Sequence, residues 1–85
     1  MDNKELLEYI RTVAVEIQPK LLPKPGHPVR NAYAHIFLVV KILCKASYDL
    51  ADQKKVLAVV NAIRENPNGR APEIFIRAKQ IYQGK

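Results

Sequence analysis

Few of the side chains that perform acid–base or metal chemistry in proteins occur in this sequence, and none is spaced for catalysis. His35 lies in an apolar stretch next to basic residues, without the nearby carboxylate or nucleophile that a general base requires. Two carboxylate pairs spaced i, i+3 could share a proton or bind a divalent ion: Glu5 with Glu8, and Asp49 with Asp52. Both pairs fall where helices are expected to begin, and acidic residues stabilise helix N-termini through the dipole alone. We therefore expect no enzyme activity, no catalytic residue and no metal site.

Cys44 is the only cysteine, and this count limits disulfide and zinc chemistry. No internal disulfide can form, and Cys44 with His27 and His35 supplies three ligands where a structural zinc site needs four. We expect Cys44 to be a small buried side chain, because it lies on the apolar stripe of a helix. The sequence also has no phosphate-binding loop, so we expect no cofactor and no small-molecule substrate.

The cysteine count and the apolar runs also indicate where in the cell the protein is expected. A single cysteine fits a reducing compartment, and no charged leader with a cleavage site is present. The apolar run at residues 36–44 contains Lys41 and is far shorter than the ~20 residues that span a bilayer. We expect a cytoplasmic protein with no membrane segment.

Residues 29–45 are the most apolar stretch and predict a central helix. Leu38 and Ile42 interrupt its polar side, and apolar residues on two sides of a helix indicate a second neighbour, either another helix or a partner chain. The segment around residues 36–40 also suits a strand, but the full apolar pattern is too long for one. At about 100° per residue, the apolar residues of this helix form one wide stripe, and Ala32 and Val39 lie at its edge. The stripe contains Val29, Tyr33, Ile36, Phe37, Val40, Leu43 and Cys44.

Three further helices are predicted from apolar periodicity and from residues that start and stop helices. Asp2 and Glu5 have capping-box spacing, Pro19 stops the first helix, and Gly84 is placed as the C-terminal cap of the last. Ser47 or Asp49 could cap the third helix, and Pro28 is placed as the first residue of the central one. On the last helix, Ile74, Phe75, Ala78, Ile81 and Tyr82 share the side that is expected to be buried. The predicted fold class is all-α, a small single-domain bundle of four helices around the central hydrophobic helix. The predicted helices cover about residues 3–17, 29–45, 50–65 and 72–83.

A proline-rich connecting loop is predicted at residues 18–28, because it contains four of the six prolines. Leu21 and Leu22 are expected to attach this loop to the bundle. Pro25 and Pro28 have PxxP spacing, so a polyproline II ligand is the alternative, although two prolines are a weak signal.

Basic charge is unevenly distributed along the 85 residues, whose net charge is +6. Residues 1–18 have a net charge of −2, and the rest of the chain therefore has +8. No carboxylate occurs between Glu16 and Asp49. This asymmetry is compatible with an acidic partner, including nucleic acid, and is also found in proteins that bind none.

The first functional hypothesis is a non-catalytic binding or regulatory module that acts through protein–protein contacts. Leu38, Ile42 and Ile76 interrupt the polar sides of their predicted helices, and together they would form the type of patch that marks interfaces. A bundle this small gains stability from oligomerising, so self-association is one form of this hypothesis.

The alternative is a nucleic-acid-binding regulator that uses a basic face of residues 29–45 and 72–83. A helix-turn-helix formed by the last two helices is favoured over one formed by the middle two, because Asp49 and Asp52 would face phosphates. The turn at residues 66–71 is longer than is usual for that motif. The predicted polyanion contacts are Arg30, Lys41, Lys45, Arg70, Arg77, Lys79 and Gln80.

Overall fold

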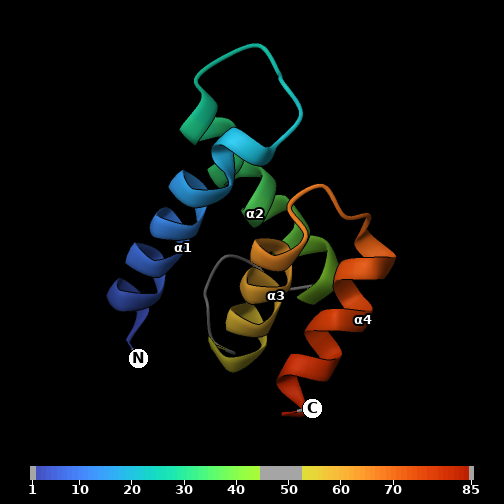
Figure 1. The fold of residues 1–85 in the computed structure, drawn as a ribbon. Helices are drawn as coiled ribbons and strands as arrows, with labels where there is room; N and C mark the ends of the chain where they lie inside the picture. Colours follow the sequence, from blue (N-terminus) through green and yellow to red (C-terminus); the bar gives the residue numbers. More distant parts are fainter. Residues whose placement is uncertain (1, 45–52, 85) are drawn as a thin grey trace.

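The computed structural model describes residues 2–44 and 53–84, and this part of the chain is all-α (Figure 1). The predicted four-helix architecture is confirmed. A short 3-10 helix, η1, follows the first α-helix. The helices are α1 (Asn3–Ile17), η1 (Gln18–Lys20), α2 (Pro28–Cys44), α3 (Gln53–Glu65) and α4 (Ala71–Tyr82).

The predicted helix starts and stops are present at three ends. The Asp2 side chain accepts a hydrogen bond from the Glu5 backbone N–H at 2.8 Å. α2 begins at Pro28, where the missing N–H of proline leaves no bond unmade. Gly84 has a φ of 75° and donates its N–H to the Ile81 carbonyl at 3.0 Å, as expected of a C-terminal cap. The expected caps Ser47 and Asp49 lie outside the described residues.

α3 occupies the middle of the bundle, between α1 and α4 and in front of α2 in Figure 1. It packs against all three of these helices, whereas α1 and α4 do not touch each other. α2 also contacts the other three, so the predicted central helix shares its position with α3. Among the described residues the core contains 17 buried apolar side chains, and six of them lie on α3: Val56, Ala58, Val59, Val60, Ala62 and Ile63.

The buried face of α2 is rotated from the predicted stripe. Ala32 and Val39, expected at its edge, are buried in the core, because small side chains allow neighbouring helices to approach closely. Tyr33 and Phe37, expected within the stripe, are only half-buried, with ring centroids 4.8 Å apart at the margin of the core.

Two other expectations about buried side chains are wrong. Phe75 and Tyr82 were predicted to share the buried face of the last helix, but 49% and 40% of their surface is exposed. Leu22 is 71% exposed, whereas Leu21 packs against the core as expected. The neighbouring helices lie on one side of α4 only. Its buried surface is therefore a narrow stripe that includes Ile74 and Ala78.

We predict that Ile63→Ala lowers the free energy of unfolding by about 2–5 kcal/mol, because Ile63 is fully buried on the most covered helix. Leu22→Ala is the control, with an expected change within about 0.5 kcal/mol. Urea denaturation followed by circular dichroism measures both. Equal midpoints for the two variants would show that the core is not centred on α3.

Candidate protein-docking surface

Large apolar side chains are exposed mainly on two helices. Of the eight that the described residues contain, five lie on α2 and α4, which pack against each other. Three of the five are the residues that the sequence proposed as an interface: Leu38, Ile42 and Ile76, which are 55%, 54% and 60% exposed. The other two are Phe75 and Tyr82, which the sequence did not propose because they were assigned to the core.

Leu38 and Ile42 lie on the side of α2 that borders the connection between α3 and α4. His35, Leu38 and Ile42 are spaced i, i+3, i+7 and therefore share one side of the helix. At the start of this row, the His35 Nε2 atom lies 3.0 Å from the Pro67 carbonyl oxygen, so Nε2 is the protonated nitrogen and donates. Leu38 and Ile42 follow along the same side, towards the C-terminal end of α2.

A hollow of about 260 Å³ lies between α3 and α4, next to the end of α2; we call it the α3–α4 hollow. Its apolar lining includes two alanines, whose short side chains leave space between the helices, and two half-exposed aromatic rings. The lining residues are Leu43 from α2, then Lys55, Ala58 and Val59 from α3, and Phe75, Ala78, Lys79 and Tyr82 from α4.

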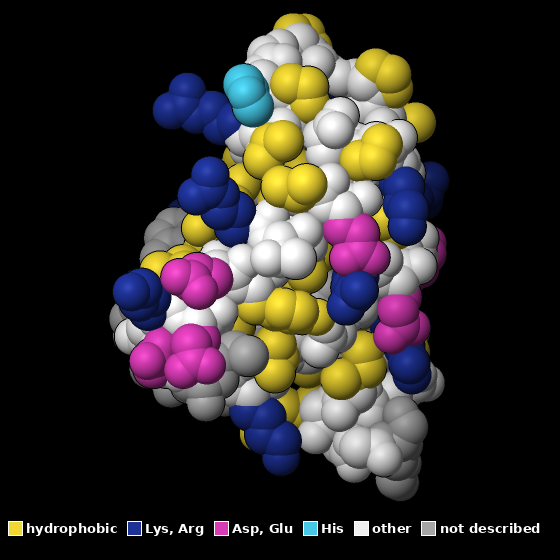
Figure 2. All heavy atoms as spheres, turned by 60° about the vertical axis from the view of Figure 1, so that its left-hand side comes forward, with side chains coloured by type: hydrophobic (Ala, Val, Ile, Leu, Met, Phe, Trp, Pro, Cys, Tyr) yellow, Lys and Arg dark blue, Asp and Glu magenta, His cyan; other side chains and the backbone are white. Residues whose placement is uncertain are grey.

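Among the described residues, the charged side chains at this hollow are lysines. Lys55 and Lys79 line it, and the Lys54 ammonium lies 5.2 Å from the centroid of the Tyr82 ring. The described lining residues include no carboxylate. On the side that carries α1, Figure 2 instead shows a mixed surface, where Asp and Glu side chains lie among those of Lys and Arg.

The basic residues proposed to contact a polyanion do not form one patch. Arg30 lines a different hollow with Arg11, in the first turn of α2, whereas Lys79 shares a hollow with Leu43 in the last turn. These turns are about 20 Å apart at 1.5 Å per residue. Lys41 is exposed on α2, Arg70 is the N-cap of α4, and Lys45 lies outside the described residues.

Arg77 and Gln80 are engaged within the protein. The Arg77 Nε donates to Glu65 Oε1 at 2.9 Å, and its Nη1 donates to Gln80 Oε1 at 3.3 Å. The hydrogen bond to Glu65, followed by the charge of that carboxylate, raises the pKa of Arg77. Reading a base or a phosphate with Arg77 would first require breaking this ion pair.

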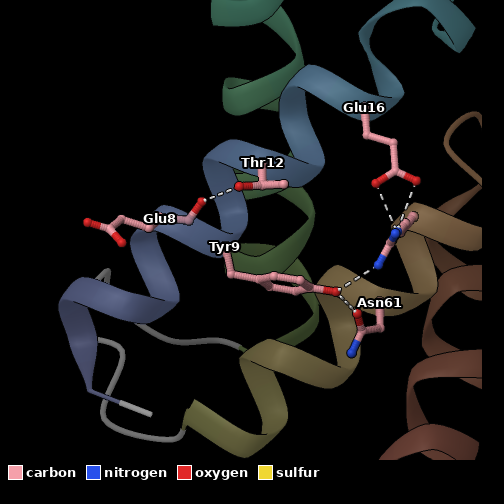
Figure 3. A network of polar contacts seen from close by, with 6 residues as sticks. Glu8, Tyr9, Thr12, Glu16 and Asn61 are labelled. Carbon is pink, nitrogen blue, oxygen red and sulfur yellow. Dashed lines mark hydrogen bonds and ion pairs between the residues drawn. The ribbon is translucent and has the colours of Figure 1, made fainter.

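A second polar network joins α1 to α3 (Figure 3). The Tyr9 hydroxyl donates to the Asn61 Oδ1, and Arg64 contacts both the Tyr9 oxygen, at 3.4 Å, and the Glu16 carboxylate, at 3.0 Å. The hydrogen bond to Glu16 is the main cause that raises the pKa of Arg64. The network therefore stabilises the packing of α1 against α3.

The proline-rich loop is held against the start of α2 and the turn before α4. Asn68 donates its Nδ2 to the Lys20 carbonyl at 2.8 Å, and its Oδ1 accepts from the Leu22 N–H at 3.3 Å. The Asn31 Nδ2 donates to the Pro25 carbonyl at 3.0 Å. A hollow of about 410 Å³ remains between the loop and these helices, and His35 is among its lining residues. The described residues of that lining include no carboxylate or cysteine.

Comparison with protein-family models, with curated proteins and with solved structures finds no match to this chain. Within residues 2–44 and 53–84, no three His, Cys, Asp or Glu side chains lie close enough to bind a metal ion. In the same ranges, no helix combines the length and the apolar composition needed to cross a membrane.

We predict that Asn68→Ala releases the start of the loop from the turn before α4, because the Asn68 side chain makes two hydrogen bonds there. The amide of Leu22 should exchange with solvent faster, and the free energy of unfolding should fall by about 1 kcal/mol. Asn66→Ala is a matched control in the same turn, since the Asn66 side chain bonds only the Glu73 carboxylate. Hydrogen exchange at Leu22 that is unchanged by Asn68→Ala, or equally fast in both variants, would contradict this role.

Proposed function

We propose that the protein is a non-catalytic binding module that docks a partner protein on α2 and α4. The proposal rests on one observation: Phe75 and Tyr82 stand half-exposed at the edge of an apolar hollow that three helices form. Aromatic side chains are enriched among the residues that dominate binding energy at interfaces. A cytoplasmic location, expected from the single cysteine, belongs to the same proposal.

Leu38, Ile42 and Ile76 support the proposal as further exposed apolar residues on these two helices. Isolated exposed side chains of this type are ordinary on a protein surface. Here they occur on the two helices that also carry the exposed rings of Phe75 and Tyr82, and exposed apolar surface marks interaction sites when it is contiguous.

Self-association through a two-fold contact is disfavoured by the charges. In such a contact the same surface patch is present on both subunits. Two hollows, each with Lys79 in its lining and Lys54 beside Tyr82, would then face each other, and like charges at close range oppose association. A different protein is therefore the partner that we propose.

We predict that a photoreactive benzoylphenylalanine at position 76 forms one discrete adduct with another protein in cells that express the full chain. The same group at the exposed position Val15 on α1 is the control and should form none. Adding Phe75→Asp should abolish the adduct at position 76, because it places a charge in the proposed anchor. An adduct of twice the chain mass would indicate self-association instead, and equal labelling at both positions would contradict a specific surface.

Nucleic acid is the second candidate, favoured by the lysines and aromatic rings at the same hollow. Bases stack on exposed aromatic side chains while cations contact the phosphates of a single strand. Phe75, Tyr82, Lys54, Lys55 and Lys79 provide both types of group.

We predict for this candidate that fluorescence anisotropy detects binding of a labelled single-stranded oligonucleotide at about 50 mM salt. Three phosphate contacts would give a slope of log affinity against log salt of about −2, since each contributes about −0.7. Lys79→Glu should weaken binding, and Arg30→Glu, a cation on the other hollow, should not. Absence of binding to single or double strands at about 50 mM salt would eliminate the candidate.

A further inference from the structure

We infer that the α3–α4 hollow binds an acidic amphipathic helix of a partner protein. The inference rests on the proposed docking function and specifies the chemistry of what docks. Such a helix would place large apolar side chains in the hollow, with Asp or Glu beside them to meet the lysines.

The size of the hollow favours protein side chains over a small molecule. Its volume is about 260 Å³. Sites for small organic ligands usually measure about 300–1,000 Å³ and enclose most of the ligand. A shallower hollow between two helices can instead accept one or two apolar side chains of a larger partner, whose remaining contacts fall outside it.

The charges around the hollow select an acidic occupant. Lys55 and Lys79 line it from α3 and α4. Lys54 adds a third ammonium beside Tyr82. Among the described residues, the Lys79 ammonium has no carboxylate partner. Carboxylates on the occupant would therefore be met by cations from both sides, and a basic occupant would be repelled.

The all-α structure around the hollow favours a helix as the partner segment that binds there. The described residues contain no β-strand, so they offer no sheet edge on which an extended peptide could pair its backbone. α3 and α4 pack side by side with Ala58 and Ala78 between them, which leaves a groove between two ridges of side chains. Amphipathic helices dock in such grooves through apolar residues at i, i+3, i+4 and i+7.

The first test uses a fluorescein-labelled helical peptide of about 16 residues, with Leu at i, i+3, i+4 and i+7 and Glu at its other positions. A matched peptide has Lys in place of every Glu. The full-length protein should bind the acidic peptide with micromolar affinity, and at least about tenfold more tightly than the basic one. Backbone NMR shift changes should be concentrated at residues 54–59 and 75–82. Equal affinity for both peptides, no binding at about 1 mM protein, or shifts centred elsewhere would overturn the inference.

Point variants test which residues contribute to binding of the acidic peptide. Lys79→Glu should weaken acidic-peptide binding at least about tenfold, and Phe75→Ala should do the same without altering the salt dependence. Arg30→Glu makes the same charge change at the hollow beside α1 and should alter the affinity less than about twofold. Both charge variants lie on the surface, and circular dichroism checks that each remains folded. Equal effects of Lys79→Glu and Arg30→Glu would show a non-specific charge attraction and overturn the inference.

The acidic helix of a second copy is the competing occupant, because α1 carries Glu5 and Glu8 next to the exposed Leu7. Light scattering that shows assembly of the wild type and its loss in Glu5→Lys/Glu8→Lys would overturn the inference in favour of this occupant. A monomer at all concentrations supports a different protein as the occupant.

The inference and the docking function can fail separately. A partner crosslinked at position 76 together with failure of the acidic peptide to bind would overturn only the inference, whereas absence of any adduct would overturn the docking function itself.

Discussion

Burial of α3 against three neighbours is the contact on which the rest of the bundle depends. Its six buried side chains face α1, α2 and α4, and Ala58 and Ala62 among them permit close approach of the surrounding helices. A chain of 85 residues buries only about 60–65% of the surface that its unfolded form exposes, so it cannot cover every helix in this way. With α3 and α2 at the centre, α1 and α4 become outer helices with only one covered stripe each. The half-exposed rings of Phe75 and Tyr82 follow from this arrangement.

The number and positions of the helices could be predicted from the sequence because local signals set them. Asp2 caps the first helix, Pro28 begins the second and Gly84 ends the last, and each acts on residues within one turn of itself. The width of a buried stripe is not local, because it depends on how many neighbours a helix has. Periodicity therefore placed Phe75 and Tyr82 on the same side of α4 as Ile74 and Ala78, but it could not show that the buried stripe excludes the two rings.

The candidate surface was predictable only in part for the same reason. An apolar residue on the polar side of a helix can be found from helical periodicity in the sequence, and Leu38, Ile42 and Ile76 are indeed exposed. Whether a cation is available to a partner depends on groups that folding brings together. Arg77 is paired with Glu65 from another helix, and Arg64 with Glu16, 48 residues away. No pattern within one helix shows these pairs, which is why the predicted basic set included a residue already engaged.

The bonds that Asn68 makes to the loop have a consequence for the chemical ageing of the protein. Asn68 is followed by Gly69, and an asparagine before glycine has little steric protection against loss of its amide. Deamidation would exchange the donor that faces the Lys20 carbonyl for a second acceptor, and an ionised carboxylate cannot donate. Two oxygens would then oppose each other at the position where the loop is now held. Slow hydrolysis at a single exposed turn would therefore detach a segment that is distant in sequence, without any change to the core.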